Sequence, residues 1–136
     1  MWERSDMSIE FKTAEPDGII FYAGERNHFV DHTALYLKGG RVHFSFNAGS
    51  GHKLLNSSEG FADDKWHTVI FNRHGKKGML YVDDVLVDEG NSDGPTVGIE
   101  VQPPFYVGGV PRDVLLKALR NLEVNWILNF NQSNIF

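Results

Sequence analysis

The chain has 136 residues, of which 41% are hydrophobic and 23% charged, as in a folded globular protein. Its 18 acidic and 13 basic side chains give a net charge of −5, which disfavours a nucleic-acid partner, and no apolar run reaches the roughly 18 to 20 residues needed for membrane insertion. The absence of cysteine excludes zinc fingers, CxxC redox sites and thiol nucleophiles. The length predicts a single domain over residues 1–136.

Alternation of apolar and polar residues predicts a series of β-strands along the chain. The pattern is clear in residues 8–12, 42–46 and 79–82. The predicted strands cover residues 8–13, 19–24, 33–38, 41–47, 53–56, 66–73, 78–83, 85–88, 96–101, 105–108, 119–125 and 127–130. Residues 112–119 follow a proline and are predicted to form a turn or a single helical turn. The sequence is therefore typical of an all-β protein.

Turn residues between these segments predict tight antiparallel hairpins. Gly39-Gly40 and Asp83-Asp84 each separate two alternating runs, and both residue types tolerate positive φ. Strands at this spacing favour an antiparallel sandwich or barrel. Aromatic residues on the strands are predicted to form its core. They are Phe11, Phe21, Phe44, Phe46, Trp66, Phe71 and Phe105.

Several motifs in this order resemble the laminin G-like domain, the sandwich module of laminin α chains, neurexins, agrin and perlecan. The most specific are DKWHTV at 64–69 and GMLYVD at 78–83. The others lie at residues 8–22, 31–42, 46–51, 105–111 and 119–125. The resemblance covers about residues 8–130 and is greatest for laminin α chains. It implies a two-sheet antiparallel β-sandwich with a jelly-roll, concanavalin-like topology, and a secreted, non-catalytic adhesion module of the extracellular matrix and basement membrane.

Two departures from the family pattern affect the expected stability. Lys117-Ala118 stand where the family has a Gly-Cys pair that forms a disulfide. The chain also begins without the family's usual first strand, which we expect to be missing or shortened. Both departures predict a lower stability or an unpaired sheet edge.

The resemblance implies a calcium ion at one rim of the sandwich, held by two carboxylates and two backbone carbonyls. These are the hard oxygen ligands that calcium prefers. Asp31 and Glu100 match the acidic positions, and Ala48 and Gly98 match the carbonyl positions. Glu100 stands where Asp or Asn is usual, so its extra methylene would displace or weaken the site, with Asp93 as a substitute ligand. The alternative is that Asp31 caps a strand and Glu100 is solvated.

The implied partner is a cell-surface receptor or an acidic glycan, with dystroglycan, heparan sulfate (heparin) and integrin as candidates, together with neighbouring domains of a larger chain. Basic and histidine side chains around the same rim would bind it. They are Arg26, His28, His52, Lys53 and Arg112. A second basic stretch, residues 73–77, is interpreted as a solvated hairpin on another turn. For a secreted chain, Asn56 and Asn131 are predicted N-glycosylation sites.

Other functions are less favoured. A metal-free structural or protein-interaction module of a matrix protein is the main alternative. His28 and His32 flank Asp31 and would permit a zinc site, although calcium is preferred on the resemblance, and His67 is expected to be structural. An enzyme is not expected, because the sequence shows no carboxylate pair suited to glycoside hydrolysis, no Gly-x-Ser-x-Gly motif and no phosphate-binding glycine loop.

Overall fold

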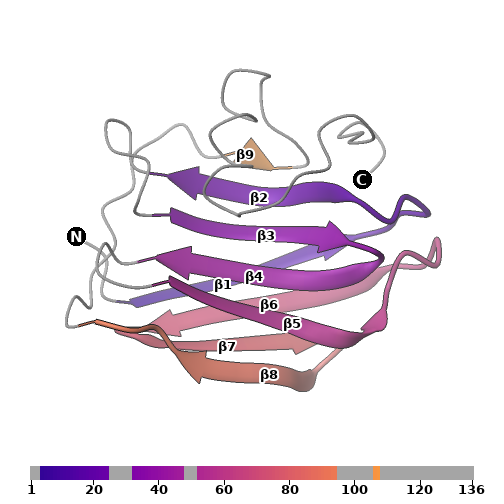
Figure 1. Cartoon of the computed structure of the whole chain (residues 1–136). Coiled ribbons are helices and arrows are strands. Elements are labelled where there is room, and N and C mark those ends of the chain that lie inside the picture. Colours follow the sequence, from indigo (N-terminus) through magenta and orange to yellow (C-terminus); the bar gives the residue numbers. More distant parts are fainter. Residues whose placement is uncertain (1–3, 25–31, 48–51, 95–105, 108–136) are drawn as a thin grey trace.

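Two antiparallel β-sheets pack face to face (Figure 1) in the computed structural model, which describes residues 4–24, 32–47, 52–94 and 106–107. The four-stranded sheet has the order β1-β6-β7-β8, and the five-stranded sheet has the order β5-β4-β3-β2-β9. The strands are β1 (Arg4–Phe11), β2 (Gly18–Gly24), β3 (His32–Lys38), β4 (Arg41–Asn47), β5 (His52–Gly60), β6 (His67–His74), β7 (Lys77–Val82), β8 (Val85–Asn91) and β9 (Tyr106–Val107). The predicted all-β, two-sheet sandwich is confirmed. No helix in the described ranges is long and apolar enough to span a membrane.

The predicted strands differ from the observed ones mainly at their ends. β1 begins at Arg4 and ends at Phe11, although a strand over residues 8–13 was expected, and β5 continues to Gly60 beyond the predicted residue 56. Apart from Met7, the added residues 4–7 and 57–60 are polar or glycine, so apolar alternation could not reveal them. The predicted strands at 96–101, 119–125 and 127–130, the turn at 112–119 and Phe105 lie outside the described residues.

Both predicted hairpins are present, with the backbone geometry that their residues favour. Gly39 and Gly40 have φ values of 60° and 79°, and Asp83 and Asp84 have φ values of 51° and 67°. Consecutive positive φ values match the right-handed twist of the strands that such a turn joins. These turns fix the registers Lys38↔Arg41 in β3–β4 and Val82↔Val85 in β7–β8.

Aromatic rings from both sheets meet in the core. The Phe44 ring lies 5.3 Å from that of Phe46 and 5.4 Å from that of Phe71, and Phe21 lies 5.8 Å from Phe71. The predicted burial of these phenylalanines and of Phe11 is confirmed. The expected burial of Trp66 is wrong, since 65% of its surface is exposed. It precedes β6, and the first inward position of that strand is taken by His67.

The sandwich has two ends, which we name after a histidine at each. The His32 end contains the last residues of β2 and β4 and the first residues of β3 and β5, namely Gly24, Asn47, His32 and His52. It lies at the left of Figure 1. The His67 end contains the start of β6 and the Asp83-Asp84 turn. The β6–β7 turn lies at the His32 end, because Gly78, at the start of β7, packs against Phe46 near the end of β4.

Candidate functional site

At the His32 end, a buried serine joins two histidines from neighbouring strands. Ser45 Oγ lies 2.8 Å from His32 Nε2 and 2.8 Å from His52 Nε2, and the two imidazole rings are 5.7 Å apart. Ser45 and His32 are both buried. A hydroxyl carries one proton, so Ser45 donates at most one of these bonds and at least one imidazole donates the other. The cluster fastens the ends of β3, β4 and β5 to one another.

The predicted calcium ligands Asp31, Ala48, Gly98 and Glu100 lie outside the described residues. The described strands nevertheless bring together the chain positions next to two of them. His32 directly follows Asp31, Asn47 directly precedes Ala48, and His32 and Asn47 are register partners across β3 and β4. The strand ends that adjoin residues 31 and 48 in sequence therefore lie together at the His32 end.

Several other predicted residues fall outside the described part of the chain. They are Arg26, His28, Arg112 and Asn131. Among the residues that the structure describes, no group of three histidine or carboxylate side chains is arranged to hold a metal ion. His32, one of the residues considered for zinc, is engaged with Ser45.

Lys53, a predicted ligand-binding residue, points between the two sheets at the flank where β5 and β8 contact each other. Its register partner is the core residue Phe46. A Cβ added at Gly90 of β8 would lie 2.5 Å from Lys53 Cε and 2.9 Å from Nζ, so the lysine stem crosses β8 where that strand has no side chain. The side chain is half-buried, with its ammonium group at the flank near the His32 end. A binding role for Lys53 stays a prediction.

The basic stretch 73–77 forms the β6–β7 hairpin, but the interpretation of all its side chains as solvated is wrong. Arg73 is only 1% exposed, and its Nη1 donates a 2.7 Å hydrogen bond to the carbonyl of Gly75. The inward positions of β6 alternate from His67 to Arg73, which accounts for this burial. The hairpin lies at the His32 end of the sandwich.

Carboxylates accompany the cations of this hairpin. His74 Nε2 donates to Asp6 Oδ1 at 3.0 Å, and Arg4 Nε donates to Asp6 Oδ2 at 2.8 Å. The hydrogen bond from His74, followed by that from Arg4, lowers the pKa of Asp6. Lys77 Nζ lies 3.7 Å from Glu89 Oε2. The positive charge at this end is thus partly balanced within the protein.

At the His67 end, one imidazole bridges two carboxylates, a contact that the sequence motifs did not predict. His67 Nδ1 lies 2.7 Å from Asp83 Oδ2, and His67 Nε2 lies 2.7 Å from Asp63 Oδ1. Asp83 Oδ1 also accepts a hydrogen bond from the Thr68 backbone at 2.9 Å. The pairing of β6 with β7 is what brings these residues together, because its register places the Asp83 turn beside the start of β6. The contacts support the expected structural role of His67.

The cluster holds a positive charge between negative ones. Burial alone would lower the pKa of His67, but the hydrogen bonds to Asp83 and Asp63 outweigh it and the pKa is raised above 6.5. The His67 hydrogen bond lowers the pKa of Asp63. Burial raises the pKa of Asp83, but the hydrogen bonds from His67 and from the Thr68 backbone outweigh it and leave the pKa below 3.8. Only the protonated imidazole donates from both nitrogens.

We expect this cluster to stabilise the fold mainly between pH 4 and 6.5. The stabilisation from the raised pKa of His67 is complete below pH 6.5 and is lost as the pH rises through the pKa of the folded state. The stabilisation from the lowered pKa of Asp83 is present above pH 3.8 and is lost as the pH falls through the pKa of the folded state. Asp83→Asn keeps a residue that tolerates positive φ and an acceptor for Thr68, but removes the charge. The free energy of unfolding of Asp83→Asn should fall furthest below that of the wild type in this pH window, and the difference should shrink above it.

Urea denaturation of wild type and Asp83→Asn across this pH range measures the difference. Asp84→Asn in the same turn is the matched control and should track the wild type at every pH. Parallel curves for wild type and Asp83→Asn would contradict the assignment.

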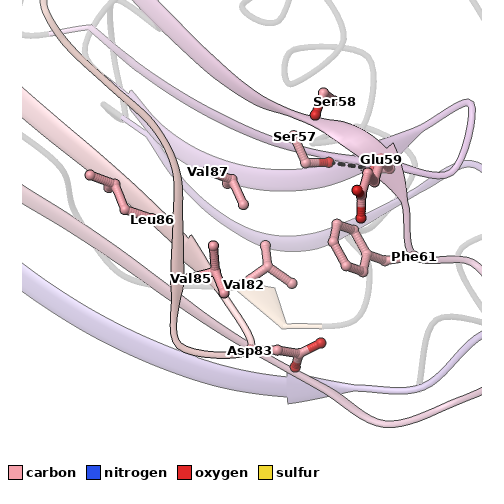
Figure 2. Close-up of a pocket in the computed structure, with 9 residues that line it drawn as sticks. All are labelled: Ser57, Ser58, Glu59, Phe61, Val82, Asp83, Val85, Leu86 and Val87. Carbon is pink, nitrogen blue, oxygen red and sulfur yellow. Dashed lines mark hydrogen bonds between the residues drawn. The ribbon is translucent and has the colours of Figure 1, made fainter.

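A groove opens between the two sheets near the His67 end (Figure 2). Its volume is about 510 Å³, and its lining comprises Ser57, Ser58, Glu59, Phe61, Val82, Asp83, Val85, Leu86 and Val87. Ser57 Oγ donates a 2.8 Å hydrogen bond to the Glu59 carbonyl, which holds the β5 wall (Figure 2). Val85 is 61% exposed and Leu86 45%. The groove is therefore an apolar opening with carboxylates at its margin.

The chain is similar to proteins of the basement membrane. It is 33% identical to human laminin subunit alpha-3 over 127 residues, which covers 93% of this chain and 4% of that protein. It is 33% identical over 121 residues to the mouse basement membrane-specific heparan sulfate proteoglycan core protein, covering 88% of this chain and 3% of that protein. The chain thus spans only a small part of either relative's length.

Solved structures agree with these relatives. Domains LG4-5 of the mouse laminin alpha1 chain superpose with a TM-score of 0.75 at 28% identity, covering 80% of this chain and 29% of that chain. The laminin G domain family matches residues 11–125. The chain therefore belongs to the laminin G domain family, whose members are non-catalytic adhesion modules, and its relatives are proteins of the extracellular matrix.

Proposed function

We propose that this chain, as a single domain over residues 1–136, binds an acidic glycan or a cell-surface receptor through a calcium ion at the His32 end. The observation that carries the proposal is the register pair His32↔Asn47, since these residues adjoin Asp31 and Ala48. His32 and Asn47, which are 15 apart in sequence, are thereby brought together at one end of one sheet.

The chemistry of the ligand set fits calcium. Asp31 and Glu100 would supply carboxylate oxygens, and Ala48 and Gly98 would supply backbone carbonyls. Some laminin G domains bind calcium. Calcium accepts more than four oxygen ligands, so positions would stay open for carboxylate or hydroxyl oxygens of a partner. The His32–Ser45–His52 cluster would support the site by holding the three strand ends together.

An acidic partner is supported by the cations at the same end. Lys53 lies at the flank there, and the β6–β7 hairpin adds Lys76 and Lys77. Arg26, His28 and Arg112 are the further proposed contacts. Heparan sulfate, the glycans of dystroglycan, and integrin are the candidate partners. Because the chain carries a net charge of −5, attraction of a polyanion is local and should weaken with salt.

Calorimetric titration with calcium tests the metal site. We expect Asp31→Ala to abolish the binding heat, because it removes one of only two carboxylates. Glu100→Asp should tighten binding, since it restores the shorter side chain usual at that position. Asp64→Asn, at the His67 end, is the matched control and should leave the heat unchanged. Equal heats for wild type and Asp31→Ala would refute the site.

A second candidate function is a metal-free protein-interaction module, favoured by the groove at the His67 end. Exposed Val85 and Leu86 with Glu59 at the margin suit an extended polypeptide in which an apolar side chain adjoins a lysine or arginine. Chelation separates the two functions. If EDTA leaves heparin and dystroglycan binding unchanged, calcium-assisted binding is excluded. Loss of receptor binding in Leu86→Asp would then support the groove.

A further inference from the structure

The middle of β5 presents a glycosylation sequon on its solvent side. The sequon is Asn56-Ser57-Ser58, and exposure alternates along it. Asn56 and Ser58 are exposed, whereas Leu55 and Ser57 are buried. The acceptor amide and the hydroxyl two residues later therefore lie on the same, outward side of one strand.

The protein fixes the backbone of this sequon without burying the acceptor. The Asn56 backbone N–H donates to Asp88 Oδ2 of β8 at 3.1 Å. Ser57 Oγ accepts from the Val42 backbone at 3.0 Å and donates to the Glu59 carbonyl at 2.8 Å. Ser57 is thus the anchoring residue, and the two residues that define the sequon face away from the core.

The surroundings of Asn56 have room for a large substituent. In the described part of the chain, β5 is the outermost strand of its sheet. Leu54, on the same outward side, is 38% exposed. The relatives are proteins of the extracellular matrix, and so pass through the secretory pathway in which such sites are modified.

We propose that Asn56 carries an N-linked glycan in the secreted protein. The oligosaccharide comes from a polyprenyl diphosphate donor. A bond forms between the sugar C1 and Asn56 Nδ2, and the bond from C1 to the diphosphate oxygen breaks. The lipid diphosphate leaves with the electron pair of that bond, and the amide proton passes to a base of the glycosyltransferase.

The position of Asn56 determines what the glycan would cover. Asn56 lies midway between His52 and Gly60, the two ends of β5. A glycan there stands over the β5 flank and Leu54, and blocks the pairing of this strand with a second copy. Asn56 is four residues from His52, at the His32 end of β5, so we expect calcium binding at that end to be unaffected by removal of the glycan.

Secretion of the chain from mammalian cells tests the proposal. Treatment with peptide-N-glycosidase F converts a glycosylated asparagine to aspartate, and peptide mass mapping locates the change. We expect aspartate at position 56 in the treated wild type. Asn56→Gln and Ser58→Ala should both abolish the glycan at this site, the second while leaving the asparagine in place.

Asn131→Gln separates the two sequons and should leave the modification at Asn56 intact. Circular dichroism of each secreted variant, compared with wild type, checks that the fold is kept, as expected for substitutions at the exposed positions 56 and 58. Unmodified asparagine at position 56 in the secreted, folded wild type would overturn the proposal, whatever the result of the calcium titration.

Discussion

Phe44→Ala is expected to lower the free energy of unfolding by about 3–5 kcal/mol, the usual cost of truncating a buried phenylalanine. Phe44 is fully buried, and its ring contacts Phe46 in its own sheet and Phe71 in the opposite sheet. Removing it deletes contacts between the sheets and leaves a cavity that two packed sheets fill poorly. Urea denaturation followed by tryptophan fluorescence and circular dichroism measures the change.

Trp66→Ala is the matched aromatic control. Most of the Trp66 surface is exposed, so its removal should change the free energy of unfolding by less than about 0.5 kcal/mol. A loss for Trp66→Ala as large as that for Phe44→Ala would show that the core is wrongly placed.

Gly78→Ala is expected to destabilise the fold by about 1–3 kcal/mol through overpacking. A Cβ at this position would lie 2.4 Å from Phe46 Cε1, 3.0 Å from Phe46 Cζ and 3.2 Å from Leu55 Cδ1. The first distance is too short for any real contact, so the Phe46 ring or β7 must move. Calorimetric unfolding of the variant gives the loss as a lowered melting temperature.

Two variants distinguish this clash from a general effect of replacing glycine in a strand. Gly60→Ala places its Cβ 3.8 Å from the nearest atom, the Gly40 carbonyl oxygen, and should be tolerated. In a Phe46→Leu background the cost of Gly78→Ala should fall, because the colliding ring atoms are gone. An undiminished cost in that background would reject the steric explanation.

Much of the fold was predictable because the relevant signals are local. Two-residue alternation located β3 and β4 to within one residue. Residue chemistry alone identified the β3–β4 turn at Gly39-Gly40 and the β7–β8 turn at Asp83-Asp84. The same alternation misjudged Trp66 by one position, since a shift of one residue exchanges the two faces of a strand. Arg73 was missed because a charged residue at an inward position is read as solvated.

The clusters at the two ends could not be predicted in the same way. Ser45 meets His32 and His52 only because of the pairing of β3, β4 and β5, and the sequence does not state which strands are neighbours. The link between His67 and Asp83 likewise depends on the β6–β7 register. The calcium ligands were inferred from a family resemblance, and their assignment stays a prediction.

The strands are long enough that charges at one end of the molecule interact only weakly with charges at the other end. β6 has eight residues, from His67 to His74, and the seven steps between them, at about 3.3 Å each, separate its ends by roughly 23 Å. In solvent at physiological ionic strength electrostatic fields decay over about 8 Å, so the two ends are nearly three such lengths apart. Gain or loss of a proton at His67 therefore alters the strength of the scaffold without direct effect on ions attracted to the far rim.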